Sequence, residues 1–290
     1  MLLQKKIGKQ VTGKFKIPEG KSIAVNFSFD FDACSVWYSY GFRTQEAMAR
    51  GEFGAEVGVP RILDILNKYN IKATFFIPGH TADTFPDISK EVVYQGHEVG
   101  HHGYAHEAVS KLSAAEEEKV MNMGLDALNR IGVKPRGYRS PSWDYSPQTL
   151  QLIEKYDFVY DSSLMANDVD PYHPRYCEVH LDKANIFGPP SKVIEIPCSW
   201  FLDDFPATEF IRGIRAGMCP VDQLYNRWTS IFNYAVANNP GSVFVLTNHP
   251  QTTGRAHMIQ LLEQMIQHIV LNNGWITTLD IIASTYQENR

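Results

Sequence analysis

The stretch FSFDFDA, residues 27–33, is the end of a hydrophobic strand-like run that leads into two acids. Successive side chains of a strand point to opposite sides, so we expect Asp30 and Asp32 to project to the same face. A run with helical spacing of apolar residues follows at 60–69, and a second strand-like run lies at 73–77. These three segments predict one β-α-β unit. Its repetition along the chain favours a parallel sheet, here a distorted, incomplete (β/α) barrel.

Later segments continue the alternation of helix and strand. Ser113 and Glu116 have the spacing of a capping box and predict a helix that stops near Gly132. Ser146-Pro147 predicts another helix start, because proline is well tolerated at the first helical position. The remaining predicted elements are a strand at 158–163, helices at 220–237 and 257–271, and a strand at 275–279.

The stretch GHEVGHHGYAHE, residues 96–107, gathers four histidines after a buried strand. Imidazole binds borderline metal ions at neutral pH, and two rings four residues apart can meet one ion when the backbone coils between them. A carboxylate from Asp30 or Asp32 could supply a third ligand. A histidine pair alone is also compatible with a hydrogen-bonded core pair, so the metal interpretation depends on further residues. Three more strand ends supply them, at 138–143, 194–200 and 244–250.

At this point the chain resembles the polysaccharide deacetylase superfamily, which has the NodB homology domain, across nearly its whole length. The resemblance implies one catalytic domain over residues 1–290, with the distorted barrel of that family. It also implies that Asp30 is the catalytic base and Asp32 a metal ligand. Phe31 separates these acids, whereas they are adjacent in deacetylases of extracellular polysaccharides. That separation, with GEFG at 51–54 and VGVPR at 57–61, resembles the branch of cyclic imide hydrolases, allantoinase-like enzymes and cytoplasmic-type peptidoglycan deacetylases.

The other family motifs imply further site residues. His102 and His106 match the pair of histidine ligands, and His101 is a competing assignment with poorer spacing. Arg139 matches the arginine that orients the base. The full set implied by the third to fifth motifs is Arg139, Pro141 and Trp143, then Glu195, Trp200 or Asp203 from a poorly preserved motif, and His249 as general acid.

The chemistry of these residues supports hydrolysis of an amide. A divalent ion with three protein ligands keeps an open position, lowers the pKa of water towards about 7 and polarises a carbonyl. Asp30 would take the proton of the attacking water, and Arg139 would hold that carboxylate in place. An amide nitrogen leaves poorly unless it is protonated, and His249 has a suitable pKa range for that step. Zn²⁺ is the expected ion.

Aromatic residues are expected to surround this centre. The segment 35–58 lacks regular patterning and carries several aromatics, so it predicts a loop that acts as a lid or a subunit contact over an enclosed pocket. Trp143 and Trp200 could instead be core aromatics, and Arg139 a surface ion-pair partner. His80, at another strand end, is expected to line the site. The predicted substrate-binding residues are Trp143, Trp200, Tyr40 and His80.

Composition limits the class of protein. The chain has 290 residues with 27 basic and 32 acidic side chains and no basic run, so nucleic acid is not an expected partner. No apolar segment has the length of a signal peptide or membrane span, which predicts the cytoplasm. The four cysteines contain no Cys-x-x-Cys pair and are expected to be free thiols, with Cys34 close to the metal or buried as a small hydrophobe.

These observations predict a zinc-dependent hydrolase of non-peptide carbon–nitrogen bonds. The favoured substrate is a small amide or cyclic imide. The alternative is a deacetylase of N-acetylglucosamine in peptidoglycan or a related polysaccharide, and a second alternative is a barrel that binds carbohydrate without catalysis. The family resemblance and the aromatic loop together predict a homotetramer.

Overall fold

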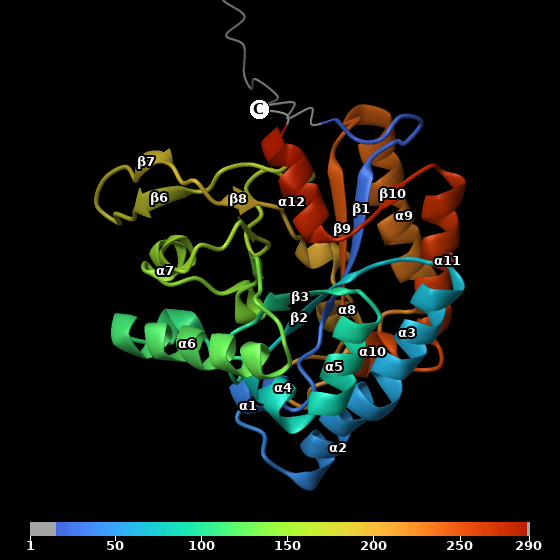
Figure 1. Ribbon diagram of the computed structural model, residues 1–290, viewed down its shortest axis with the longest axis horizontal. Helices are drawn as coiled ribbons and strands as arrows, with labels where there is room; N and C mark the ends of the chain where they lie inside the picture. The colour runs from blue at the N-terminus through green and yellow to red at the C-terminus, as the bar shows by residue number, and fades with distance from the viewer. Residues whose placement is uncertain (1–15, 289–290) are drawn as a thin grey trace, which may run out of the picture.

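One curled parallel sheet organises the structure, a computed structural model that describes residues 16–288 (Figure 1). The sheet order is β10-β1-β2-β3-β4-β5-β8, with β9 also paired to β1, and all these pairings are parallel. The strands are β1 (Ala24–Asp30), β2 (Thr74–Ile77), β3 (Glu98–His101), β4 (Gly137–Tyr138), β5 (Tyr160–Asp161), β8 (Ile194–Glu195), β9 (Val243–Asn248) and β10 (Trp275–Ile276). Helices surround the sheet, which confirms the distorted, incomplete barrel.

Strand β1 lies at the centre of this arrangement. It pairs with β9 from Ala24 to Phe29, with β2 at its carboxyl end and with β10 at its amino end. All seven of its residues are buried, as expected for a parallel strand that is covered on both faces. The strands β4, β5 and β8 have only two residues each, so each of them pairs with its neighbours over a short length.

Amphipathic helices bury the outer face of the sheet. The largest core cluster joins Phe27 and Phe29 of β1 to apolar side chains of α3 (Val59–Lys68), α9 (Val221–Asn238) and α11 (Met258–Leu271). The predicted apolar stripe of α11 is buried, which confirms its packing role. Within residues 16–288, none of the helices combines the length and apolarity that a membrane crossing requires.

Local sequence signals place several helix ends correctly. The capping box of Ser113 and Glu116 is formed at the start of α6 (Ala114–Arg130). The predicted start at Ser146-Pro147 is early, because α7 covers Thr149–Lys155. Ser146 Oγ nevertheless accepts hydrogen bonds from the backbone N–H of Gln148 and Thr149. The strand predicted at 158–163 shrinks to the two residues of β5.

The prediction of an irregular loop at 35–58 is wrong. This segment forms α1 (Ser35–Ser39), α2 (Gln45–Phe53) and a π-helical turn (Gly54–Gly58) that runs into α3. A Cβ at Gly51 would lie 2.5 Å from the backbone N of Cys34, and one at Gly58 would lie 2.3 Å from the carbonyl oxygen of Pro250. Tertiary packing therefore requires glycines that weaken the helical pattern in the sequence.

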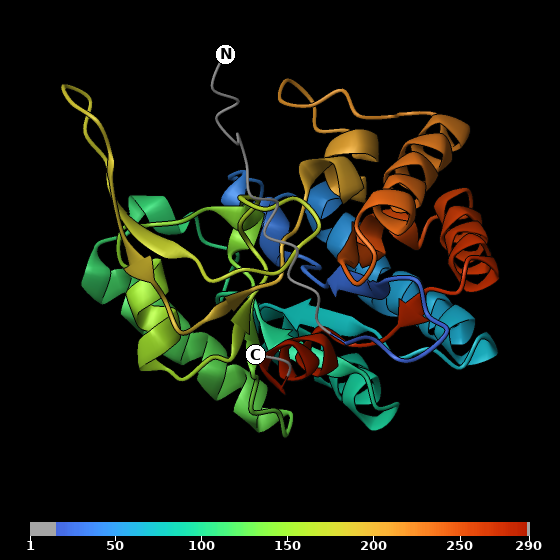
Figure 2. The same ribbon diagram turned by 90° about the horizontal axis from the view of Figure 1, so that it is seen from above.

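The remaining elements lie around the sheet. The short helices are α4 (Gly79–Thr84), α5 (Pro86–Tyr94), α8 (Asp204–Thr208), α10 (Pro250–Thr253) and α12 (Leu279–Glu288), with 3₁₀ turns at Val109–Lys111, Pro141–Trp143 and Trp200–Leu202. Strands β6 (Arg175–Glu178) and β7 (Ile186–Pro190) form a separate antiparallel hairpin that projects from the body (Figure 2).

Candidate metal centre and catalytic site

The candidate site lies at the carboxyl ends of the central strands. Asp30 ends β1, His102 follows β3, Arg139 follows β4 and His249 follows β9. Parallel strands that start at one edge bring their carboxyl ends together at the other, so residues far apart in the chain meet there. The structure brings together the predicted acids, histidines and arginine.

Asp32, His102 and His106 form a compact group of possible metal ligands. Their ligand atoms lie within 4.8 Å of one another, and all three side chains are buried. Nε2 of His102 is 3.4 Å from Oδ1 of Asp32, and Nε2 of His106 is 3.7 Å from Oδ2 of the same carboxylate. Nδ1 of His102 donates to the carbonyl oxygen of Arg139 at 2.8 Å, which leaves the Nε2 lone pair facing Asp32.

The unpaired atoms of this group fit a bound cation. Both carboxylate oxygens of Asp32 and Nε2 of His102 are buried without a hydrogen-bond partner. Burial alone would raise the pKa of Asp32, but His106, His102 and His249 lower it below its usual value. Burial lowers the pKa of His106 to about 4, so this ring is a neutral ligand. Burial alone would lower the pKa of His102, but Asp30 and Asp32 raise it above its usual value, and a bound cation would take the place of that proton. One carboxylate and two imidazoles are the donor set of many hydrolytic zinc sites.

Asp30 is held by the guanidinium of Arg139 and faces two imidazole rings. Nη1 of Arg139 donates to Oδ1 of Asp30 at 2.7 Å. The other carboxylate oxygen of Asp30 lies 3.9 Å from Nε2 of His102 and 4.0 Å from Nε2 of His249. Arg139 has no exposed surface and packs 4.2 Å from the centre of the Phe76 ring, so the alternative of a surface ion pair is wrong.

His249 is fixed by an acid that the sequence analysis missed. Nδ1 of His249 donates to Oδ1 of Asp204 at 2.7 Å, and the backbone N–H of His249 donates to Oδ2 of Asp204 at 3.0 Å. Burial alone would lower the pKa of His249, but Asp203, Asp204 and Asp32 raise it to about 10. Nε2 is thereby directed towards Asp32, 3.7 Å away. The sequence signal was present, because Asp204 directly follows the candidate Asp203.

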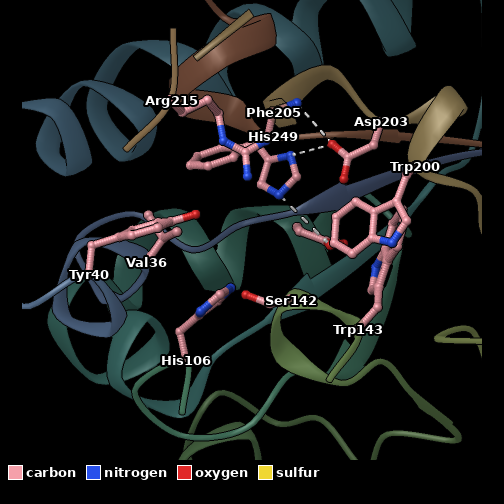
Figure 3. Close-up of a pocket in the computed structure, with 11 residues that line it drawn as sticks. Val36, Tyr40, His106, Ser142, Trp143, Trp200, Asp203, Phe205, Arg215 and His249 are labelled. Carbon is pink, nitrogen blue, oxygen red and sulfur yellow. Dashed lines mark hydrogen bonds and ion pairs between the residues drawn. The ribbon is translucent and has the colours of Figure 1, made fainter. Parts of the chain in front are cut away.

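A small cavity of about 130 Å³ opens beside these groups (Figure 3). Trp143 and Trp200 form one wall with ring centroids 4.1 Å apart, and Trp200 keeps 43% of its surface exposed at the rim. Tyr40 stands on another wall. Trp200 is therefore not a core aromatic, and Trp143 is buried but also lines the cavity. The full lining is Asp30, Val36, Tyr40, His106, Ser142, Trp143, Trp200, Asp203, Phe205, Arg215 and His249.

His80 does not line this cavity, contrary to the prediction. It lies on α4, where its ring contacts Tyr38 and Tyr104 edge-on and its Nδ1 lies 3.3 Å from the Thr84 hydroxyl. The strand end at β2 therefore directs this side chain to neighbouring helices and loops.

Other candidates also lie outside the ligand group. Nε2 of His101 lies 3.1 Å from the carbonyl oxygen of Met121, so the ring of His101 points away from Asp32. Glu195 accepts hydrogen bonds from two backbone N–H groups and does not line the cavity. Cys34 donates to the carbonyl of Met48, which favours its interpretation as a buried small residue.

Comparison with known proteins gives consistent similarities. Residues 52–160 match the polysaccharide deacetylase family model. A peptidoglycan deacetylase of Helicobacter pylori is 34% identical over 287 residues, which cover 93% of this chain and 98% of that protein. The crystal structure of a putative polysaccharide deacetylase from Mycobacterium smegmatis has a TM-score of 0.83 at 31% identity and covers 94% of this chain and 93% of that one. A Puue allantoinase structure, at 20% identity and a TM-score of 0.77 with 94% and 93% coverage, has the same fold.

Proposed function

This chain belongs to the polysaccharide deacetylase family, and we propose that it is a zinc-dependent hydrolase that opens a compact amide or cyclic imide. The observation that carries the proposal is the buried group of Asp32, His102 and His106 beside a small cavity, in which both oxygens of Asp32 and Nε2 of His102 have no hydrogen-bond partner. A site of this kind is suited to a planar amide group rather than to a large ligand.

The metal and the protein residues have separate tasks. A divalent cation held by Asp32, His102 and His106 would supply a Lewis acid that polarises a carbonyl and lowers the pKa of water. Asp30 accepts the proton of the attacking water, because its free carboxylate oxygen faces the space between His102 and His249. Arg139 holds the other oxygen of Asp30, which fixes the direction of proton transfer.

His249 delivers a proton to the leaving nitrogen. Its Nδ1 is occupied by Asp204, so its Nε2 is the atom available to the substrate. Nε2 of His249 lies 4.0 Å from Oδ2 of Asp30, whereas Arg139 binds Oδ1 of the same carboxylate. Asp30 can therefore accept a proton from water while His249 gives one to the leaving nitrogen. Protonation of the nitrogen is needed because an amide anion is a very poor leaving group.

The cavity size favours a small substrate. Pockets for drug-sized ligands usually have volumes of about 300–1,000 Å³. The cavity here has about 130 Å³ and is walled by the Trp143–Trp200 pair, Tyr40 and Phe205. A ring-shaped amide fills such a space, whereas a saccharide chain would enter it with its acetamido end.

Deacetylation of N-acetylglucosamine in peptidoglycan is the second candidate. It is favoured by the 34% identity to the Helicobacter pylori peptidoglycan deacetylase over nearly both whole chains. Trp200 is 43% exposed at the rim of the cavity, and an aromatic ring of this kind can stack on a sugar that stays outside.

Parallel hydrolysis assays would separate the candidates. Zinc-loaded protein is given cyclic imides and ureides, and separately N-acetylglucosamine oligomers and peptidoglycan. His102→Ala serves as the inactive variant and His257→Ala, at an exposed histidine, as the matched control. Ring opening without acetate release supports the small-amide proposal, and acetate release from the glycan supports the second. Equal turnover by wild type and His102→Ala, or no turnover by either protein, would support the alternative of a barrel that binds carbohydrate without catalysis.

The proposal extends to assembly and location. We expect a homotetramer in the cytoplasm, and a monomeric mass in solution with full activity would contradict the assembly. Light scattering on the active protein measures that mass directly.

A further inference from the structure

Arg215 enters the cavity from a tight turn that no family motif covers. Backbone hydrogen bonds join Arg215 N–H to the carbonyl of Ile211 at 2.8 Å and Ile211 N–H to the carbonyl of Arg215 at 2.9 Å. Ile211 is buried in a small core with Trp37 and Phe205, and Gly213 has the positive φ of 76° that the turn requires. The backbone that carries Arg215 is therefore anchored to the body of the protein.

Aromatic groups hold the guanidinium of Arg215. Its Cζ lies 5.7 Å from the centre of the Phe205 ring. Burial raises the pKa of Tyr40, and Arg215 is the main opposing influence, which reflects how close the guanidinium lies to the phenol oxygen. Figure 3 shows the Arg215 side chain across the cavity from His106, beside His249 and above Tyr40.

The positive charge of Arg215 has no acidic counterpart in the described part of the chain. Among residues 16–288, no carboxylate oxygen lies within 4.0 Å of its guanidinium nitrogens. The other charges of the cavity are matched, because Asp30 pairs with Arg139 and Asp203 lies 3.5 Å from His249. Arg215 thus offers several N–H donors to whatever fills the cavity.

We propose that Arg215 binds a carboxylate of the substrate, so that the enzyme acts on an anionic amide and discriminates against its uncharged counterpart. This inference rests on the proposed hydrolysis of a carbon–nitrogen bond. A guanidinium fork matches a carboxylate with two parallel hydrogen bonds, whereas a neutral substrate would leave its donors unsatisfied. The carboxylate belongs to a cyclic ureide if the substrate is small, or to the lactyl ether of N-acetylmuramic acid if it is a glycan.

Two pairs of compounds test the inference. Dihydroorotate and dihydrouracil differ by one carboxylate. N-acetylmuramic acid and N-acetylglucosamine differ by a lactyl group, which carries a carboxylate. Affinities are measured by calorimetry on zinc-loaded protein, and kcat and KM are measured with the same compounds. We expect wild type to bind the anionic member of one pair at least tenfold more tightly, and that pair identifies the source of the carboxylate.

Variants at Arg215 assign the preference to this residue. Arg215→Gln should abolish the preference and raise the KM of the anionic compound at least tenfold. Arg215→Lys keeps the positive charge and should retain part of the preference for the anionic compound. That result would also show that the turn still folds in a variant at this position. Arg212→Gln, at an exposed arginine of the same turn, should behave as wild type. No preference in either pair, or a preference that persists in Arg215→Gln, would overturn the inference.

The two measurements separate this inference from the proposed function. Arg215-dependent affinity without hydrolysis of any compound would refute the function and support the role of Arg215. Hydrolysis of the neutral and anionic members with equal kcat/KM would support the function and refute the role of Arg215.

Discussion

Replacing Arg139 by methionine should strongly destabilise the protein, because Asp30 would keep a buried charge without its partner. Arg139 donates to Oδ1 of Asp30 at 2.7 Å, to the Ser28 hydroxyl at 2.9 Å and to the carbonyl of Ser162 at 2.9 Å. Asp30 itself is only 2% exposed. Removing one member of a buried ion pair costs about 3–5 kcal/mol, and we expect Arg139→Met to fall in that range.

A double-mutant cycle isolates the ion pair from the other contacts. Asp30→Asn removes the buried negative charge, so Arg139→Met should cost less in that background. The lost hydrogen bonds to Ser28 and Ser162 are common to both backgrounds and cancel. The expected coupling between the two substitutions is about 2 kcal/mol.

Urea unfolding followed by tryptophan fluorescence measures the four free energies. A chelator in every sample removes any stabilisation by bound metal, and circular dichroism checks that each variant folds. Costs that add within about 0.5 kcal/mol would show that the two side chains do not interact, and would refute the assignment of Arg139 as the residue that orients Asp30.

Four shorter predictions concern other parts of the structure. His249→Ala should lower kcat by about 10²–10⁴-fold, and Asp204→Asn, which keeps the ring but weakens its hold, by less; unchanged kcat in both would remove His249 from proton transfer. Chelation should abolish hydrolysis, and Zn²⁺ at 100 times its Kd should restore about 2.7 kcal/mol of stability in thermal melts, whereas an unchanged Tm would contradict a metal centre. Burial, aided by Lys72, lowers the pKa of His97 to about 4, so His97 takes up a proton in the unfolded chain before it does in the folded one as the pH falls below about 6.5. Between that pH and pH 5 the free energy of unfolding of wild type should fall by about 1–2 kcal/mol more than that of His97→Asn. Urea titrations of both proteins measure this difference, and an equal fall in the two would contradict the prediction. Gly58→Ala should cost about 1–3 kcal/mol, since its Cβ would meet the Pro250 carbonyl at 2.3 Å, while Gly188→Ala has only contacts of 3.7 Å and should be nearly neutral; similar Tm values for the two would refute the close approach.

Elements with strong local signals were predicted well. The capping box at Ser113 and the apolar stripe of α11 depend on residues three or four apart, and both are present in the structure. The strand-end positions of Asp30 and His249 also follow from runs of adjacent residues. Such predictions hold because the spacing of apolar and capping residues favours the helix or strand locally, and the tertiary contacts then pack an element of that type.

Segments whose conformation depends on distant contacts were predicted poorly. The helices between residues 35 and 58 contain Gly51 and Gly58, which are needed for close approach to Cys34 and Pro250 and which weaken the helical pattern. Asp204 and Arg215 lie 45 and 34 residues from His249 in the sequence, and no periodicity connects them to it. Their roles follow only from the packing of a short helix and a turn around the cavity.

The sequence by itself determined which residue types stand at the strand ends, because these depend on short-range pattern and on the chemistry of each side chain. The tertiary structure decided which of them meet. His101 and His102 are adjacent, and alternation at the end of β3 sends His101 to Met121 and His102 to Asp32. The ion pair of Arg139 with Asp30 joins residues 109 positions apart, on strands that β2 and β3 separate, and only the curl of the parallel sheet brings the two side chains into contact.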